Sequence, residues 1–395
     1  MELNRTKQIL YGIAALVILG ALGFGAYWYL SSSITAPAKS DKASGTGIVP
    51  GLPDTDGGET KEEPSTGETP PPEIPPQEQA LVQLTNFSVV GPSLNTAEDR
   101  ILFYKKAGGD LMSADFNGQK QEKISNITIL GILDALWNSS RNRAVVQYID
   151  GEMLKSFIHS GTSSISALPT DILAASWSPD GKSLAYALPK NGGSASLIIA
   201  DSSGKNPKEV STSPLTDSSI RWITSNLIAL QTAPSGYAEG YIFLYSRSTG
   251  ALNKILGLKN GLQTVWAPDG SKFLASHTNR AGKSLTLGIY DSAGKELFQT
   301  GLPALAEKCV WPDAKNAFCA VPRSIPENAL LPDDYLMGEF NSSDRIIKIN
   351  LDAKESKVIF DEGVFDISNI IASKDGSRIF FIDRSNGTLW RIKLK

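Results

Sequence analysis

The sequence predicts an all-β fold built from a unit that repeats seven times. One position of the unit aligns at seven places in the chain, and five of the seven tryptophans of the chain stand there. The aligned residues are Asn95, Trp137, Trp177, Trp222, Trp266, Trp311 and Ala372. Successive positions are spaced by 42, 40, 45, 44, 45 and 61 residues. A period of ~40–45 residues with four short strands is typical of a propeller blade. We therefore expect a seven-bladed β-propeller of four-stranded antiparallel blades. Six or eight blades stay open, because the first and last units lack the tryptophan.

Short apolar runs between turn residues mark the strands of each unit. The expected second strands are Ile101–Lys106, Ala144–Ile149, Leu184–Leu188, Leu227–Thr232, Lys272–His277, Ala317–Val321 and Arg378–Asp383. The expected third strands are Leu111–Phe116, Glu152–Phe157, Ser196–Asp201, Tyr241–Ser246, Ser284–Asp291, Arg345–Asn350 and Thr388–Lys393. Hairpin turns such as Asn117-Gly118 follow the third strands by composition.

The two ends of the repeat region predict how the ring closes. The last unit stops one strand short of a blade, at Lys395. The apolar segment Ala80–Thr85 has no partner in its own unit and resembles the fourth strands Leu252–Gly257 and Lys357–Asp361. Pairing it with Thr388–Lys393 would remove two exposed sheet edges. We therefore expect the N-terminal strand to complete the last blade.

Two copies of a turn motif carry a resemblance to a known family. Trp-Ser-Pro-Asp-Gly-Lys-Ser-Leu-Ala-Tyr at 177–186 and Trp-Ala-Pro-Asp-Gly-Ser-Lys-Phe-Leu at 266–274 resemble the WD-repeat-like propeller repeats of the TolB type, and residues 375–381 form a weaker copy. The resemblance covers residues 80–395. It implies an envelope-facing bacterial protein that binds rather than reacts. A Tol-Pal-like role is not implied, because the N-terminal α/β domain of TolB is replaced here.

The N-terminal part predicts a membrane anchor and a tether. Residues 9–30 carry no charge, and 22 helical residues at ~1.5 Å each span a bilayer. Arg5 and Lys7 place residues 1–8 in the cytoplasm by the positive-inside rule, although a cleaved signal peptide stays an alternative. Residues 31–79, rich in Pro, Gly and acidic groups, read as a disordered linker. We expect a single-pass plasma-membrane protein with residues 80–395 outside the cell.

The two cysteines are expected to form a disulfide. A five-residue loop between two strands puts Cys309 opposite Cys319, within disulfide range, with two buried thiols as the alternative. We expect no metal and no cofactor, because His159 and His277 are the only histidines and neither has a ligand at metal-binding spacing. Both histidines are expected at loop edges. The net charge of −3 and the lack of a basic run exclude a nucleic-acid partner.

Candidate binding residues fall where the repeat is irregular. The 23-residue loop Pro322–Asp344 mixes acidic and aromatic groups suited to a sugar or peptide, and it is otherwise a lid over the channel mouth. The loop Ala233–Gly240 should lie on the same face. First strands should line a central channel that binds a small polar ligand or holds water. The binding candidates are Asp333, Asp334, Tyr335, Phe340, Tyr237 and Glu239, and the channel candidates are Asp134, Gln263, Lys308 and Asn369.

Three functions are compatible with this pattern. The sequence favours a monomeric, non-enzymatic binding or scaffolding module that engages a protein or envelope glycan through its loop-rich face, with no catalytic residues. The alternative is an extracytoplasmic polysaccharide hydrolase or lyase that uses channel-face carboxylates. A third is a structural partner in a membrane assembly, contacted through residues 9–30.

Overall fold

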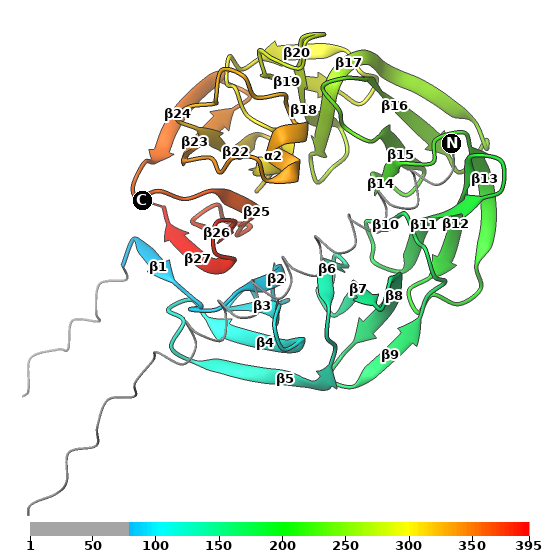
Figure 1. Ribbon diagram of the computed structural model, residues 1–395, viewed down its shortest axis with the longest axis horizontal. Coiled ribbons are helices and arrows are strands. Elements are labelled where there is room, and N and C mark those ends of the chain that lie inside the picture. The colour runs from blue at the N-terminus through cyan, green and yellow to red at the C-terminus, as the bar shows by residue number, and fades with distance from the viewer. Residues whose placement is uncertain (1–78, 395) are drawn as a thin grey trace, which may run out of the picture. The chain divides into compact units, whose positions relative to one another are not determined.

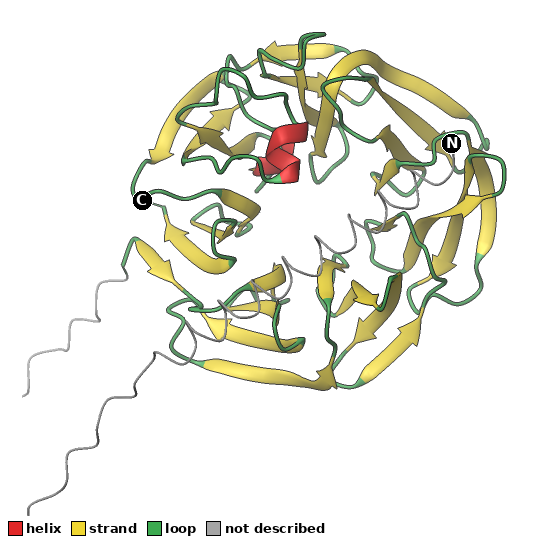
Figure 2. Cartoon of the chain, in the orientation of Figure 1, coloured by secondary structure: helices red, strands yellow, loops and turns green. Residues whose placement is uncertain are grey.

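The computed structural model describes residues 79–394, whose strands surround a common centre (Figure 1; Figure 2). These residues form five four-stranded antiparallel sheets and one seven-stranded sheet. In four of the four-stranded sheets the chain begins with the strand nearest the centre and moves outward, and in the fifth the outermost strand comes from the N-terminal end of the described residues (Figure 1). The expectation of an all-β chain of repeated four-stranded sheets is confirmed.

The first three sheets follow one another along the chain. They contain β2 (Val89–Leu94), β3 (Arg100–Lys105), β4 (Asp110–Asp115) and β5 (Gln121–Thr128); β6 (Ile132–Trp137), β7 (Arg143–Asp150), β8 (Met153–Ser160) and β9 (Ser164–Ala167); and β10 (Ala174–Trp177), β11 (Ser183–Lys190), β12 (Ser194–Asp201) and β13 (Lys208–Ser213).

One long strand joins two units into the seven-stranded sheet. This sheet contains β14 (Ser218–Trp222), β15 (Leu227–Thr232), β16 (Glu239–Ser246), β17 (Leu252–Trp266), β18 (Lys272–Thr278), β19 (Thr286–Asp291) and β20 (Glu296–Gln299). The sequence predicts a fourth strand that ends at Gly257 and a separate first strand, but β17 runs through both. The register shifts between Asn260 and Gln263, so the chain bulges there and keeps its pairing instead of turning.

The last two sheets carry the irregular features. One is preceded by the short helix η1 (Ala306–Lys308) and contains β21 (Cys309–Val310), β22 (Asn316–Pro322), β23 (Asp344–Asn350) and β24 (Glu355–Phe360). The connection from β22 to β23 holds the helix α2 (Asp333–Met337), where the sequence predicts only a loop. The other contains β25 (Ile367–Ala372), β26 (Arg378–Asp383), β27 (Thr388–Lys393) and β1 (Leu81–Gln83).

Strand β1 completes the last sheet, as the ends of the repeat region predict. Leu81 pairs with Ile392 and Gln83 pairs with Trp390 in antiparallel register. The backbone N–H of Leu389 donates to Thr85 Oγ1 at 3.0 Å, which ties the end of the segment to β27. The strand is shorter than the expected Ala80–Thr85. The chain then continues from β1 into β2, so the last sheet and the first sheet are directly connected.

The repeated tryptophans pack between neighbouring sheets. Trp177, Trp222, Trp266 and Trp311 are 4–6% exposed. The indole N–H of Trp177 donates to the carbonyl of Leu136 at 2.8 Å, and that of Trp311 donates to Val265 at 3.0 Å. Each bond links one sheet to the inner strand of the preceding sheet. These residues therefore hold the sheets together and fix the shape of the ring.

No helix within residues 79–394 is long and apolar enough to cross a membrane. The expected span 9–30 and nearly all of the expected linker 31–79 lie outside the residues that the structure describes. The membrane anchor, the linker and the plasma-membrane location therefore stay predictions.

His159 is buried inside β8, so its expected position at a loop edge is wrong. Its Nδ1 lies 2.6 Å from the Tyr104 hydroxyl, and its Nε2 lies 3.1 Å from the Ser125 hydroxyl. The register of β7 and β8 turns its side chain toward the first sheet, where both partners are buried. Burial lowers the pKa of His159, because the charged imidazolium loses its hydration there.

We predict that His159 makes stability depend on pH. The unfolded chain binds a proton at this residue near pH ~6.5, whereas the native chain binds it only at lower pH. The free energy of unfolding should therefore fall as the pH falls below about 6.5. Denaturant unfolding at several pH values measures the slope.

The matched control is His277→Gln, because burial also lowers the pKa of His277. In the His159→Gln chain, the free energy of unfolding should change less with pH. The His277→Gln chain should keep the contribution that His159 makes to this pH dependence. An unchanged slope in His159→Gln would contradict the assignment.

Candidate functional site

The long loop between β22 and β23 folds over the inner face of the ring, where it carries α2 (Figure 1). Asp333 Oδ1 accepts a hydrogen bond from the Ser235 hydroxyl at 2.8 Å, and its Oδ2 accepts one from the Gly236 N–H at 2.6 Å. Asp334 Oδ2 accepts from the Leu330 N–H at 2.7 Å. Both acids therefore fix the loop itself, and they place it on the same face as residues 233–240.

The other loop candidates divide between packing and exposure. Phe340 packs against Tyr335, with ring centroids 5.8 Å apart. Glu239 accepts a hydrogen bond from the Tyr241 hydroxyl at 3.1 Å. Tyr237 is 82% exposed, so its ring is free to contact a ligand from solution.

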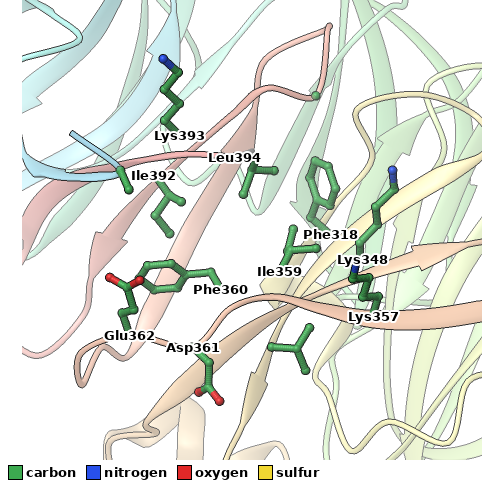
Figure 3. A pocket seen from close by; sticks show the side chains of 13 residues that line it. Phe318, Lys348, Lys357, Ile359, Phe360, Asp361, Glu362, Ile392, Lys393 and Leu394 are labelled. Carbon is green, nitrogen blue, oxygen red and sulfur yellow. The ribbon is translucent and has the colours of Figure 1, made fainter. Parts of the chain in front are cut away.

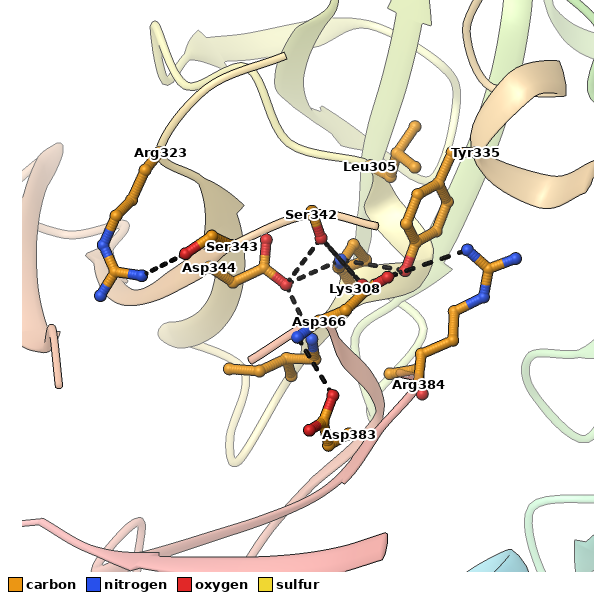
Figure 4. Close-up of polar contacts among 12 residues, drawn as sticks. Leu305, Lys308, Arg323, Tyr335, Ser342, Ser343, Asp344, Asp366, Asp383 and Arg384 are labelled. Carbon is orange, nitrogen blue, oxygen red and sulfur yellow. Dashed lines mark hydrogen bonds and ion pairs between the residues drawn. The ribbon is translucent and has the colours of Figure 1, made fainter. Parts of the chain in front are cut away.

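Lys308 lies at the centre of a buried polar cluster (Figure 4). Its Nζ is 2.7 Å from Asp344 Oδ2 and 2.8 Å from Asp366 Oδ1. The hydroxyls of Ser342 and Tyr335 lie 2.6 and 3.0 Å from the same Nζ. These groups come from η1, α2, β23 and the start of β25, so only the folded chain brings them together.

The two carboxylates of the cluster respond differently to burial. Burial raises the pKa of Asp344 more than the Lys308 ammonium lowers it. For Asp366, burial is outweighed by Lys308 and by hydrogen bonds from Tyr335 and Ser342, so its pKa is lowered. The charged form of Asp366 is therefore more strongly stabilised than that of Asp344, because Asp366 accepts more hydrogen bonds.

Arg384 adds a second cation beside this cluster (Figure 4). Its guanidinium lies 4.4 Å from the centre of the Tyr335 ring, and its Nη2 donates to the Leu336 carbonyl at 3.2 Å. Its Nη1 lies 3.9 Å from Asp366 Oδ2 and has no hydrogen-bond partner among the described residues. The Arg384 side chain is 27% exposed, so part of it reaches solvent beside the cluster.

A cavity of about 260 Å³ adjoins these groups at the inner face. Its described lining residues are Glu307, Lys308, Tyr335, Leu336, Ser368, Asn369 and Arg384. Glu307 is exposed to the cavity, and its Oε2 accepts a hydrogen bond from Gln263 Nε2 at 3.0 Å. Desolvation by the surrounding ring raises the pKa of Glu307, although Lys308 and Arg384 act against the shift. The cavity thus combines an acid–base group with a cation.

The structure brings three of the four channel candidates into this region. Lys308 and Asn369 line the cavity, and Gln263 orients Glu307. Asp134 lies elsewhere on the inner face, on β6, and burial raises its pKa. Sequence reasoning missed Glu307, although it adjoins Lys308 in the chain. It also missed Asp366 and Arg384, which stand in ordinary positions of the last unit.

Cys309 and Cys319 face each other across β21 and β22, as the loop length predicts, and they form a disulfide. Both are buried next to Trp311. The bond holds the short strand β21 directly after Lys308. The disulfide therefore helps to fix the position of Lys308, although neither cysteine contacts the charged groups of the Lys308 cluster.

A second cavity, of about 500 Å³, lies away from the centre of the ring, between β24 and the end of β27 (Figure 3). Phe318 and Phe360 line it together with Lys348 and Lys357. Asp361, at its edge, pairs with Arg323 at 2.7 Å. Glu362 and Lys393 also line this cavity, but it lies at the outer strands of two sheets. The inner-face cavity lies beside the buried Lys308 cluster and is the better candidate.

The described residues do not fit a metal centre. No group of three or more His, Cys, Asp and Glu side chains within residues 79–394 could hold a metal ion. Asp344 and Asp366 converge, but the Lys308 ammonium already occupies the position between them. A lysine thus supplies the positive charge that these carboxylates need.

No family model matches this chain, and no curated protein matches it. Among solved structures, it is similar to an oligogalacturonate lyase in complex with manganese, at 11% identity and a TM-score of 0.54, covering 80% of this chain and 93% of that one. An oligogalacturonate lyase from Vibrio parahaemolyticus gives 10% identity, a TM-score of 0.53 and coverages of 79% and 93%. The β-propeller domain of the Trilobed protease from Pyrococcus furiosus, described as having an open velcro topology, is 13% identical with a TM-score of 0.55. The match covers 78% of this chain and 96% of that one.

These likenesses show the fold, which is a β-propeller, in agreement with the repeat. They do not test whether this propeller is of the TolB type, so that assignment stays a prediction. They contradict the expectation of a non-enzymatic binding or scaffolding module without catalytic residues, because two of these neighbours are lyases. The alternative expectation of a polysaccharide hydrolase or lyase agrees with them better. The physical reason is that the inner face of a propeller brings together side chains from several blades, which suits catalysis as well as binding.

We predict that Lys308→Met lowers the free energy of unfolding by about 3–5 kcal/mol, because it leaves two buried carboxylates without a counterion. Denaturant unfolding measures the change. Lys315→Met is the matched control, because Lys315 and Asp352 form an exposed pair with side chains 71% and 65% exposed. The control should barely change stability.

Adding Asp344→Asn and Asp366→Asn to Lys308→Met should restore much of the lost stability, because the buried negative charge is then removed. A Lys308→Met chain as stable as the control would show that the cluster is not the charged core of the site.

Proposed function

We propose that this chain is a carbohydrate-degrading enzyme, a lyase that cleaves an acidic oligosaccharide at the inner-face cavity. The observation that carries the proposal is the pairing of Glu307, whose pKa is raised, with the partly exposed side chain of Arg384 in one cavity. The fold shared with oligogalacturonate lyases supports the same class of reaction. A cavity of about 260 Å³ suits a single sugar residue at the point of cleavage.

Arg384 would bind the carboxylate of a uronate residue. A guanidinium matches a carboxylate with two parallel hydrogen bonds, and the Arg384 side chain lines the cavity and is 27% exposed. The bound cation also withdraws charge from the uronate. It therefore stabilises the enolate that forms when the proton next to the carboxylate leaves.

Glu307 would act as the base and then as the acid. Its carboxylate takes the proton from C5 of the uronate, next to the sugar carboxylate. The bond from C4 to the bridging oxygen then breaks, a double bond forms between C4 and C5, and Glu307 returns the proton to the leaving oxygen. No water is consumed and no atom is left over. A raised pKa makes the carboxylate a stronger base, which favours the removal of the C5 proton.

The Lys308 cluster would hold these two groups in place. Asp366 faces Arg384 on one side and Lys308 on the other, and Tyr335 stacks between Arg384 and the cluster. The exposed ring of Tyr237, on the loop that Asp333 ties down, would contact a further sugar of the chain. The loop-rich face is thus the proposed glycan-binding surface.

We further propose that the ring has seven blades, a monomeric propeller of the TolB type. Counting β14–β20 as two blades that share β17 supports this number. The uncharged segment 9–30 supports a location outside the plasma membrane, tethered through the linker.

We predict that Glu307→Gln lowers lyase activity by at least ~100-fold, because the amide cannot take or return a proton. The substrate is an oligogalacturonate, and the ultraviolet absorbance of the new C4=C5 double bond measures elimination. In the unchanged chain, the rate should fall as the pH falls through the raised pKa of Glu307, because the base becomes protonated.

Glu209→Gln is the matched control, because Glu209 forms an exposed pair with Lys190 on the outer strand β13 and should leave the rate unchanged. Release of reducing ends without the ultraviolet signal would identify a hydrolase and overturn the lyase. Equal activity in Glu307→Gln would remove Glu307 from the mechanism.

We predict that the full chain sediments with membranes and that residues 80–395 are cut by protease added outside intact cells. Deletion of residues 1–35 should release the chain into the soluble fraction. Protection of the propeller in intact cells, or an equally soluble full chain, would contradict the proposed location.

A further inference from the structure

A bulge in β25 places one side chain at the inner-face cavity. The register shifts between Ser368 and Ile371, so two residues of β25, Asn369 and Ile370, face a single residue of β26. An extra residue of this kind interrupts the alternation of a strand and redirects a side chain, and bulges are frequent next to active sites. Ile370 is buried, whereas Asn369 is exposed and lines the cavity of about 260 Å³.

The first sheet contains the same bulge with a glycine in it. The register of β2 shifts between Val90 and Ser93, which leaves Gly91 in the position of Asn369. Both residues have a positive φ, 58° for Gly91 and 47° for Asn369. Glycine adopts this left-handed conformation readily, and asparagine is among the few other residues that tolerate it. The bulge therefore needs a residue that accepts a positive φ, but it does not need a side chain.

The side-chain amide of Asn369 has no partner among the residues that the structure describes. The neighbouring Ser368 hydroxyl, in contrast, donates to the Ile382 carbonyl at 3.1 Å. Asn206, the other described asparagine with a positive φ, donates from its amide to Asp201 at 2.9 Å. An amide carries an acceptor oxygen and a donor NH₂ group. Asn369 thus presents both kinds of group to the cavity.

The spacing of Asn369 and Arg384 leaves room for one sugar ring. The backbone N–H of Arg384 donates to the Asp366 carbonyl at 2.8 Å, so Arg384 is level with Asp366 on the neighbouring strand. Asn369 lies three residues further along β25, which is at most about 10 Å of strand. Both side chains line the cavity, and the long arginine side chain covers part of this distance. A ring that fills the rest would have its carboxylate at Arg384 and its hydroxyls at Asn369.

We propose that Asn369 binds the ring hydroxyls of the uronate whose carboxylate Arg384 holds, and that it makes the site specific for uronates with free hydroxyls at C2 and C3. The substrate in this inference rests on the proposed lyase function. Two neighbouring hydroxyls match one amide, because one donates to Oδ1 while the other accepts from Nδ2. An acetyl group on either oxygen removes one of these hydroxyls and adds bulk, so the site discriminates against acetylated uronates.

The first experiment measures binding without cleavage. Trigalacturonate is titrated by calorimetry into the full chain that carries Glu307→Gln, which retains the binding groups but not the base. Adding Asn369→Gly keeps the bulge and removes the amide, so it should weaken binding by about tenfold, the effect of losing two hydrogen bonds. Asn369→Asp should weaken binding further, because its negative charge repels the uronate.

The second experiment measures specificity in the chain with Glu307 intact. The kcat/KM for oligogalacturonate is divided by that for the same substrate acetylated at O2 and O3. This ratio should fall about tenfold in Asn369→Gly, because only the free hydroxyls lose a partner. Asn206→Gly is the matched control, since it makes the same change at a positive φ in the turn between β12 and β13. It should alter neither the affinity nor the ratio.

The combined results separate this inference from the lyase itself. Cleavage by a chain in which Asn369→Gly changes neither the affinity nor the ratio would overturn the role of Asn369 and leave the lyase in place. Binding that weakens in Asn369→Gly, in a chain that cleaves nothing, would support Asn369 as a glycan-binding residue and overturn the lyase. A chain that neither binds nor cleaves oligogalacturonate would overturn both. Denaturant unfolding should give Asn369→Gly the same stability as the unchanged chain, which excludes misfolding as the cause of a loss.

Discussion

The pairing of β1 with β27 is the constraint on which the rest of the structure depends. Each sheet covers its apolar faces with its two neighbours, so the arrangement has no exposed face only when the first and last sheets meet. The cluster that joins them draws on both ends of the repeat region, with Leu84 and Phe103 from one side and Phe380 and Leu389 from the other. Pairing two distant segments orders a long loop, and the repeated packing between sheets offsets that entropy.

The closed ring makes the buried Lys308 cluster possible. An ammonium and two carboxylates lose hydration when they are buried, and such a group is rarely a source of stability by itself. Here Tyr335 and Ser342 form hydrogen bonds with Lys308 and Asp366, and α2 covers these groups from the inner face. One oxygen of each carboxylate, Asp344 Oδ1 and Asp366 Oδ2, has no hydrogen-bond partner among the described residues. The close packing of the cluster also positions Arg384, which contacts Asp366 and Tyr335, and Glu307, which precedes Lys308 in the chain. Rigidity of this kind is what a catalytic constellation needs.

The two ends of the inner face differ in chemistry because different parts of each unit build them. The rim near α2 is made of long, irregular connections, which carry acids, cations and aromatic side chains. The other rim is made of short repeated turns, where Ser178 and Asp180 satisfy one another and the backbone. At the position before the repeat tryptophan, β14 carries the exposed Arg221, where neighbouring units carry the neutral Ser176 and Val265.

The sequence by itself determined the architecture. The repeat period, the turn residues and the apolar runs are all local features of the sequence. The hairpin that follows Trp177 and the pairing of Cys309 with Cys319 depend only on such local features, because each is set by the register of two consecutive strands. The continuous strand β17 and the buried His159 departed from expectation, because bulges and contacts between sheets override local signals. Only the tertiary structure decided the site. Glu307, Lys308, Asp366 and Arg384 are ordinary polar residues in the chain, and their chemistry arises from burial and from partners up to 58 residues away.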